Sequence, residues 1–474
     1  MRYLALLVLL FTAPLSVAQP LAFNAELIPS QLGDIAAFGT AVATDGDLAL
    51  ASAANDNVVV AFSRTADGWA QEAVIAAAAL DTGDLFGQFV EFDGQRLLVS
   101  ARGDDSDAGE NTGAVYVFER SEGGWVETAK LTASDAEAGD FFGESVDLDG
   151  DQAITATLVG GAAYVFTHTG SGWAEEAILV PDDPEDAPFF GAAVAIEGNL
   201  ALVGSPRFGD TPQVGAIYAF TRGADGWSQT AKLSVASDEN PDQIGYNFDY
   251  QDGTLVAIGF GAGASSYVFA YDGAMWTLEA EIPLPEGGPA FFTTIGPFDP
   301  VSLDGDDVLI GATSFDGGGA YLFSRSNGAW TLEATIESPF EEELVSFGQA
   351  VHLNESQAVI GAFRADAFRG RAFVYGSRPV GTADDPETTP RLSAVVYPNP
   401  AYQRAHVTFE AARPSVVHLE VYDLLGRQLV TATERVPAGA HTLDVDADDL
   451  AAGLYVLRLR VGDEATATTL QVLR

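Results

Sequence analysis

The chain has 474 residues, no cysteine, and 68 acidic against 22 basic residues, which gives a net charge of −46. Without cysteine no disulfide can hold the fold, so its stability must come from core packing and strand pairing. Such a negative charge disfavours binding to nucleic acid or to anionic membranes, whose phosphates would be repelled. A chain of this length exceeds what one hydrophobic core organises, so a repeat architecture or several domains are expected.

Residues 1–18 have the features of a secretory signal peptide. Arg2 precedes an apolar run from Leu4 to Phe11, and Ser16 and Ala18 place small residues where a signal peptidase cuts. The run is too short to serve as a membrane anchor, and no transmembrane segment is expected in the mature chain. The sequence therefore predicts export through the periplasm, to the medium or to the cell surface.

A unit of about 51 residues recurs through the next part of the chain. Each unit opens with a Phe-Gly step or a close variant, continues to an aromatic-x-aromatic step, and most units then have a Trp after a polar turn. The opening steps begin at Phe38, Phe86, Phe142, Phe190, Ile244, Ile295 and Phe347, and the tryptophans are Trp69, Trp125, Trp173, Trp227, Trp276 and Trp330. This period is typical of the blades of a β-propeller.

Each unit is predicted to form four short strands. In the second unit these are Gln88 to Phe92, Arg96 to Ala101, Ala114 to Glu119, and Trp125 to Leu131. Apolar and β-branched runs alternate with Asp-Gly and Gly-Gly turns, as in consecutive antiparallel hairpins. Four-stranded sheets repeated around an axis make a propeller, so residues 19–375 are predicted to be a seven-bladed β-propeller.

The seventh unit lacks a Trp strand after Tyr375, where the sequence becomes rich in turn residues. A similar strand, Asn24 to Ile28, precedes the first unit and resembles the segment that follows Trp125. We therefore expect the N-terminal strand to complete the last blade and to close the ring.

The units resemble FG-GAP repeats, the blade motif of the integrin α-subunit propeller and of many bacterial surface proteins. Lys130 to Ala153 illustrates the likeness, which extends from about Phe23 to Tyr375. The resemblance implies the propeller fold and says little about function. Integrin-like blades often carry a calcium loop of alternating Asp and Asn residues, whereas this sequence has only short turns such as Asp149 to Asp151.

One loop of the second unit is the densest acidic cluster that also carries turn residues. It contains Asp104, Asp105, Asp107, Glu110 and Asn111, which could hold a calcium ion loosely; the alternative is a solvated loop.

The same loop begins with Arg102-Gly103-Asp104, the tripeptide that integrins recognise. An Arg followed by an Asp recurs at Arg207 to Asp210 and at Arg364 to Asp366. This recurrence favours a local ion pair within each loop over an adhesive motif.

The acidity belongs to the repeats. From Arg391 to the C-terminus 10 acids face 8 arginines, a net charge of −2, which leaves −44 for the preceding residues. Such a surface is typical of proteins adapted to concentrated salt, where ions screen self-repulsion. The alternative is a dedicated cation-binding surface.

Residues 376–391 are rich in Pro, Thr and Asp and are predicted to be an extended linker. Residues 392–474 alternate apolar and polar positions over six or seven short runs, which predicts a small Ig-like β-sandwich.

This last segment resembles the type A sorting domain of the type IX secretion system. The residues that carry the likeness are Pro398, Asn399, Pro400, Asp423, Gly426, Arg427, Gly439, Gly453 and Tyr455. The resemblance implies recognition by an outer-membrane secretion machinery, with the cargo then released or tethered to the surface. The alternative is an ordinary Ig-like binding module.

No catalytic pattern is assembled in the sequence. There is no His-x-x-x-His or Gly-x-Ser-x-Gly step, and with 68 acids close carboxylate pairs are inevitable and uninformative. The sequence favours a non-enzymatic propeller for binding, adhesion or surface structure, with an extracellular protein or glycan as partner. The alternative is an extracellular hydrolase of polysaccharide or peptide.

Overall fold

The computed structural model describes residues 21–34, 36–65, 68–78, 80–121, 123–157, 159–206, 215–235, 244–259, 265–283, 300–313, 318–339, 346–354, 357–376, 394–397, 401, 404–411, 413, 415–423, 427–437, 439–446, 450–451, 453–461 and 464–472. The predicted signal peptide lies outside these residues, as does the predicted linker apart from Gly376, which ends a strand.

Residues 22–376 contain seven four-stranded antiparallel sheets within the described part of the chain, numbered here by repeat unit. Sheets 1 to 3 consist of β2 (Phe38–Thr44), β3 (Leu48–Ala53), β4 (Val58–Thr65) and β5 (Gly68–Ile75); β6 (Phe86–Phe92), β7 (Arg96–Ala101), β8 (Ala114–Ser121) and β9 (Gly124–Leu131); and β10 (Phe142–Asp149), β11 (Gln152–Thr157), β12 (Ala163–Thr169) and β13 (Gly172–Leu179).

Sheets 4 to 7 follow the same plan. They consist of β14 (Val194–Glu197), β15 (Leu200–Ser205), β16 (Ala216–Gly223) and β17 (Gly226–Leu233); β18 (Phe248–Gln251), β19 (Thr254–Ile258), β20 (Ser265–Tyr271) and β21 (Trp276–Pro283); β22 (Val301–Asp304), β23 (Asp307–Ala312), β24 (Gly319–Ser326) and β25 (Ala329–Glu337); and β26 (Val351–Asn354), β27 (Gln357–Ala362), β28 (Arg371–Gly376) and β1 (Ala22–Leu27).

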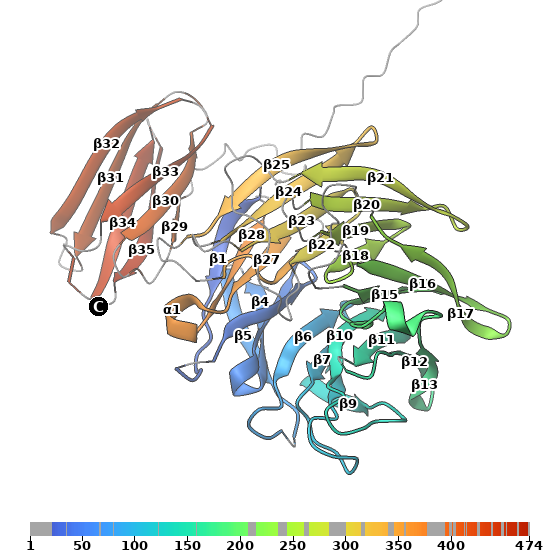
Figure 1. Ribbon diagram of the computed structural model, residues 1–474. Helices are drawn as coiled ribbons and strands as arrows, with labels where there is room; N and C mark the ends of the chain where they lie inside the picture. The colour runs from blue at the N-terminus through green and yellow to red at the C-terminus, as the bar shows by residue number, and fades with distance from the viewer. Residues whose placement is uncertain are drawn as a thin grey trace, which may run out of the picture.

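The first strand of each sheet contacts the first strand of the next, from β2 through β6, β10, β14, β18 and β22 to β26, and β26 in turn contacts β2. The fourth strands, such as β9, β13, β17, β21 and β25, lie toward the periphery (Figure 1). The chain is thus all-β, with repeated four-stranded sheets, an arrangement consistent with a propeller. No helix in the described part of the chain is long and apolar enough to cross a membrane.

The Phe-Gly step contributes to the packing of five of the sheets, and the predicted step at Ile295 lies outside the described residues. Phe86 contacts the two aromatic residues of the third strand edge-on, with ring centroids 5.7 Å from Tyr116 and 5.9 Å from Phe118. In the first unit, the glycine of the Phe-Gly step is Gly39, whose backbone φ is 84°. A Cβ atom on Gly39 would lie 2.2 Å from the carbonyl oxygen of Arg371 on sheet 7. Only glycine accepts both the backbone conformation and this close approach.

The N-terminal strand belongs to the last sheet, as the sequence predicted. β1 pairs antiparallel with β28, with Phe23 opposite Tyr375 and Leu27 opposite Ala372. The strand runs two residues earlier at its start than the sequence indicated, and Ile28 lies just beyond its end.

The six tryptophans occupy one position. Each lies at or near the start of the fourth strand of its sheet and pairs with the equivalent residue of the third strand, as Trp125 does with Arg120 and Trp227 with Arg222. Each packs, partly buried, against a core cluster between sheets. The tryptophans therefore occupy equivalent positions on the fourth strands of six sheets.

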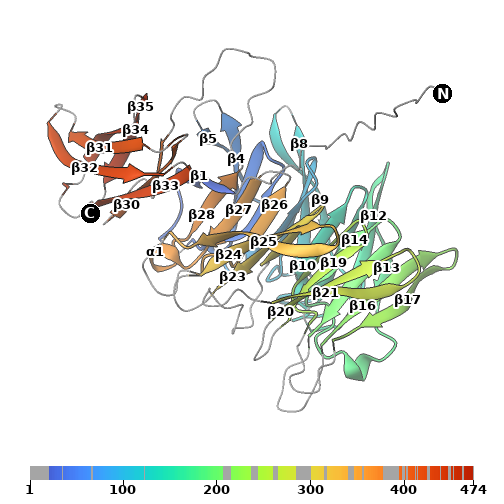
Figure 2. The ribbon, with the colours of Figure 1, turned by 90° about the horizontal axis from the view of Figure 1, so that it is seen from above.

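The C-terminal residues form two further sheets around one apolar core. The strands are β29 (Ala394–Tyr397), β30 (Arg404–Ala411), β31 (Ser415–Asp423), β32 (Gln428–Val436), β33 (Gly439–Asp446), β34 (Gly453–Val461) and β35 (Glu464–Val472). β29, β30 and β33 make one sheet; β32, β31, β34 and β35 make the other. Figure 2 shows them to one side of the repeats, near β1 and β28.

Candidate functional site

A cavity of about 330 Å³ lies where the first strands of sheets 2 to 7 meet. Five of these six strands place a polar side chain at the same register position, and the fourth sheet has Ala195 there. The polar residues are Glu91, Asp147, Asp249, Ser302 and His352, and all of them line the cavity.

Two of the carboxylates at this position join neighbouring sheets. Asp147 accepts a hydrogen bond at its Oδ2 from the backbone N–H of Ile196 on the next sheet, at 2.6 Å, and at its Oδ1 from its own neighbour Leu148, at 2.8 Å. Asp249 accepts in the same way from Leu303 on the next sheet and from Tyr250, both at 2.7 Å.

Ser302 repeats this link to sheet 7, since its Oγ accepts from the N–H of Leu353 at 2.9 Å.

A second layer of such bonds lies at the turns after the first strands. Asp149 Oδ2 accepts from Gly198 N at 2.7 Å, Glu197 Oε1 from Asp252 N at 3.2 Å, and Gln251 Oε1 from Gly305 N at 2.6 Å. In both layers the side chain of one sheet accepts from the backbone of the next. The first strand lies at the edge of its sheet, so some of its backbone N–H groups have no partner within the sheet. The side-chain acceptors of the neighbouring sheet provide hydrogen-bond partners for these N–H groups.

Burial perturbs the ionisable groups of the cavity. Burial raises the pKa of Asp147 to about 7; the N–H of Ile196 opposes this shift and the charge of Asp249 adds to it. Burial likewise raises the pKa of Asp249 to about 6, against the N–H groups of Leu303 and Tyr250. Burial lowers the pKa of His352 to about 4, so its imidazole is neutral at neutral pH.

The cavity wall carries no compensating positive charge. Its described lining has six carboxylates and no Lys or Arg. The acids are Glu91, Asp147, Asp149, Glu197, Asp249 and Asp304. The site can therefore accept hydrogen bonds and attract a cation, and sequence reasoning had not singled it out. The only signal was an acid two residues before an Asp-Gly turn, which occurs at Glu91 and at Asp147, among 68 acids in the chain.

The loop proposed for calcium is arranged differently from its prediction. Asp104 is buried, and its carboxylate accepts from Lys130 Nζ at 2.7 Å and from the Tyr116 hydroxyl. Asp105 is exposed, and its Oδ1 accepts from the N–H of Asn111 at 2.7 Å.

Asp107 and Glu110 are exposed in the same loop, and among the described residues no three His, Asp or Glu side chains converge to hold a metal ion. Calcium binding at this loop stays a prediction. The carboxylate of Asp104 is already bonded to Lys130 and Tyr116, so it could bind calcium only if these contacts changed.

The Arg-Gly-Asp tripeptide is not presented as a motif. Gly103 and Asp104 are buried, and Arg102 pairs with Glu144 of sheet 3 at 2.9 Å. The predicted pair between Arg102 and Asp104 is therefore wrong, because each side chain has a closer partner of opposite charge. In the seventh unit Asp366 pairs with Arg371, at 2.7 Å, and residues 207–214 of the fourth unit lie outside the described residues.

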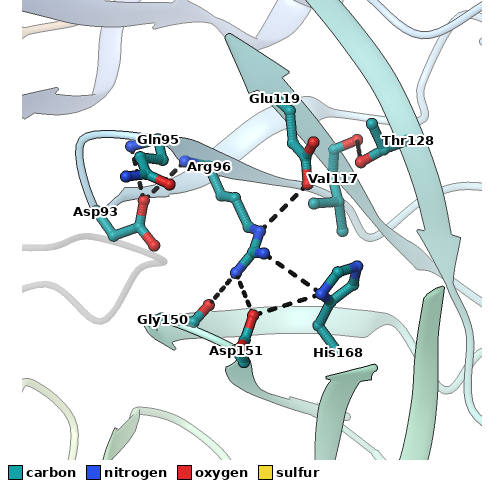
Figure 3. A network of polar contacts seen from close by, with 9 residues as sticks. All are labelled: Asp93, Gln95, Arg96, Val117, Glu119, Thr128, Gly150, Asp151 and His168. Carbon is teal, nitrogen blue, oxygen red and sulfur yellow. Dashed lines mark hydrogen bonds and ion pairs between the residues drawn. The ribbon is translucent and has the colours of Figure 1, made fainter. Parts of the chain in front are cut away.

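A polar network between sheets 2 and 3 was also missed by sequence reasoning (Figure 3). Arg96 donates from Nη1 to the carbonyl of Gly150 at 2.6 Å and to Asp151 Oδ1 at 2.8 Å, and from Nε to Glu119 at 3.3 Å. Its Nη2 lies 3.3 Å from Nδ1 of His168. These contacts tie the two sheets together.

The residues that resemble a sorting motif are only partly described. Asp423, at the end of β31, pairs in register with Tyr455 of β34, whose hydroxyl donates to the carbonyl of Ala451 at 2.6 Å. Gly439 and Gly453 begin β33 and β34, and Arg427 is exposed just before β32. The remaining motif residues, Pro398, Asn399, Pro400 and Gly426, lie outside the described residues.

Comparison with known families identifies both parts of the chain. Residues 69–118, 125–166 and 173–220 match the FG-GAP repeat, and residues 395–472 match the secretion system C-terminal sorting domain. No curated protein matches the chain.

Solved structures resemble it at low identity. A Lactobacillus plantarum protein is 14% identical with a TM-score of 0.46, covering 64% of this chain and 86% of its own. A functionally unknown protein from Desulfotomaculum acetoxidans is 11% identical with a TM-score of 0.40, covering 81% and 95%. The SapL1 lectin in complex with alpha methyl fucoside is 13% identical with a TM-score of 0.36, covering 64% and 97%.

The family matches agree with the repeated sheets and with the separate C-terminal core. The chain therefore contains FG-GAP repeats, matched in three successive segments, and a C-terminal sorting domain of the type IX secretion system.

Proposed function

We propose that the protein is a seven-bladed β-propeller, closed by β1, that is exported and binds a ligand outside the cell without turning it over. The C-terminal sheets are the Ig-like sandwich that the secretion machinery reads. The ligand site is the cavity between the first strands. The FG-GAP and sorting-domain matches support an exported or surface propeller, and the seven successive sheets support the blade number.

The observation that carries binding is the convergence of polar side chains on one cavity. Asp147, Asp249 and Ser302 come from three separate sheets, and each is fixed by a backbone N–H of the next sheet. A site whose polar groups are already held in place loses little side-chain entropy when a ligand binds.

Export can be tested by removing residues 392–474. The repeats should then fold and remain in the periplasm, because the sorting domain has its own core and supplies none of the seven sheets. Cell fractionation with limited proteolysis reads both properties. Normal secretion of the truncated protein would show that the domain does not direct export and would favour an ordinary binding module.

Binding can be tested on residues 19–474 with glycan and peptide arrays, followed by turnover assays on every ligand that is retained. Asn354→Trp places a bulky ring at the edge of the cavity and should abolish retention, whereas Asp225→Asn, at an exposed outer turn, should not. Retention that is unaffected by Asn354→Trp would move the site elsewhere. Turnover of a polysaccharide or peptide, lost on one carboxylate substitution, would replace the proposal with a hydrolase.

A further inference from the structure

We infer that the cavity between the first strands binds an organic cation, one whose amine or guanidinium groups meet the carboxylates of its wall. This inference rests on the proposed binding role of the cavity and adds the chemical class of its ligand.

The first step is charge. Six carboxylates line the cavity and no Lys or Arg does so among the described lining residues. Two acids buried elsewhere in the repeats have a basic partner, since Glu144 pairs with Arg102 and Asp104 with Lys130. Asp147 and Asp249 each receive two backbone N–H groups, which satisfy their hydrogen bonds without neutralising their charge.

The second step is the state of those charges. Burial raises the pKa of Asp147 to about 7, with a contribution from the charge of Asp249, and burial raises that of Asp249 to about 6, with a contribution from Asp304. No basic side chain is among the causes that act on either carboxyl. Apart from the six carboxylates, the titratable side chains of the described wall are Tyr250 and His352, neither of which brings a positive charge at neutral pH. A bound cation would relieve this repulsion, lower both pKa values and so release protons.

An independent observation is His352. It lines the same cavity and is enclosed by protein, and its Nδ1 has no hydrogen-bond partner among the described residues. Buried polar atoms normally have a hydrogen-bond partner. A buried imidazole nitrogen without one, in the wall of a cavity, therefore indicates that a ligand provides the partner. A neutral imidazole can accept from an ammonium or a guanidinium N–H.

The size and the spacing of the donors decide the class of cation. Water occupies about 30 Å³ per molecule, so 330 Å³ holds several water-sized groups and far exceeds a single metal ion. No three His, Asp or Glu side chains among the described residues come close enough to hold a metal together. Carboxylates spread around the wall suit an extended ligand with two or more separated positive groups.

The test is calorimetric titration of residues 19–474 with spermidine, agmatine, NaCl, CaCl2 and a neutral oligosaccharide. It is run near pH 6.5 in two buffers with different heats of ionisation. We expect one saturable site for spermidine or agmatine. The difference between the heats measured in the two buffers should correspond to a net release of protons on binding. Diffuse association with the acidic surface would instead be unsaturable, and moderate salt would abolish it.

Matched variants locate the site. Asp147→Asn and Asp249→Asn each remove one charge and keep one acceptor oxygen, and either should weaken amine binding by at least about tenfold and reduce the proton release. Asp225→Asn removes one charge at an exposed outer turn and should leave both unchanged. His352→Phe should weaken binding without altering net charge, and circular dichroism confirms that each variant is folded.

The outcomes separate this inference from the proposed function. Saturable binding of the neutral oligosaccharide, sensitive to Asn354→Trp, with no amine binding would overturn the cation and keep the binding role. A saturable calcium or sodium site, without amine binding, would also overturn it. Amine binding with equal affinity in Asp147→Asn, Asp249→Asn and Asp225→Asn would place the interaction on the general surface and refute the inference.

Discussion

Phe38, the first residue of β2, forms a parallel bridge with Gly370, the residue just before β28. The same bridge joins Gly113 to Phe142 between sheets 2 and 3, and Gly318 to Phe347 between sheets 6 and 7. The first and last sheets therefore meet through the contact that joins consecutive sheets. β1, which completes sheet 7, holds the two ends of the repeat region together.

Deleting residues 22–27 should destroy the cooperative fold of the repeats. Sheet 7 would lose its fourth strand, exposing the outer edge of β28 and the apolar surface that Leu27 covers. Limited proteolysis and thermal melting of the purified protein measure this. Deletion of residues 392–474 is the control and should leave the melting temperature of the repeats unchanged. If the protein without residues 22–27 melted at the same temperature as the full protein, the role of β1 would be contradicted.

Removing the partner of a buried acid should cost far more than removing that of an accessible one. Glu144 is buried, and Arg102→Ala would leave it uncompensated at a cost of about 3 kcal/mol. Arg222 also bridges two sheets, to Glu176 at 2.7 Å, but its side chain is accessible, so Arg222→Ala should cost about 1 kcal/mol or less. Urea denaturation gives both free energies of unfolding, and equal losses would refute the distinction.

The buried acids should make the protein more stable in mildly acidic solution. The folded pKa is raised to about 7 for Asp147, about 6 for Asp249 and about 7 for Glu26. A raised acid pKa means that the folded state binds more protons than the unfolded one, so stability falls as pH rises from about 4 to 7. His352, with its pKa lowered to about 4, opposes this between about 4 and 6.5.

Thermal melts from pH 5 to pH 8 in molar salt measure this effect, because salt screens the exposed charges and leaves buried ones largely unscreened. Asp249→Asn should flatten the dependence, and Asp225→Asn should not. A pH dependence that disappears in molar salt would assign the whole effect to the surface.

Salt itself should stabilise the repeats and leave the C-terminal domain almost unchanged. The net charge is −44 before Arg391 and −2 from there to the end, and self-repulsion rises with charge density. Melting residues 19–391 and 392–474 separately across a salt series compares the two slopes. If the melting temperatures of the two fragments rose equally with salt concentration, the acidity of the repeats would not be an adaptation to concentrated salt.

The sequence by itself determined the strands, the repeat and the partner of the N-terminal strand. Alternating apolar residues, Asp-Gly turns and the recurring Phe-Gly and Trp positions are local signals, and each of the seven units repeats most of them. The seventh unit has no Trp strand of its own, and one additional strand precedes the first unit. The sequence therefore indicated that this strand, β1, completes the seventh sheet, where it pairs with β28. The likeness to a sorting domain was equally readable, since its motifs lie in order along 80 residues and match the family.

Only the tertiary structure decided which charged residues meet. Asp147, Asp249 and His352 lie on separate sheets, each about 100 residues from the next along the chain, and no local pattern shows that they line one cavity. Arg102 pairs with Glu144, 42 residues away, instead of the nearby Asp104, because the first strand of sheet 3 packs against sheet 2. Strand formation follows short-range pattern, whereas a cavity is assembled from one residue per sheet, and its members share a position only after the sheets have packed around one centre.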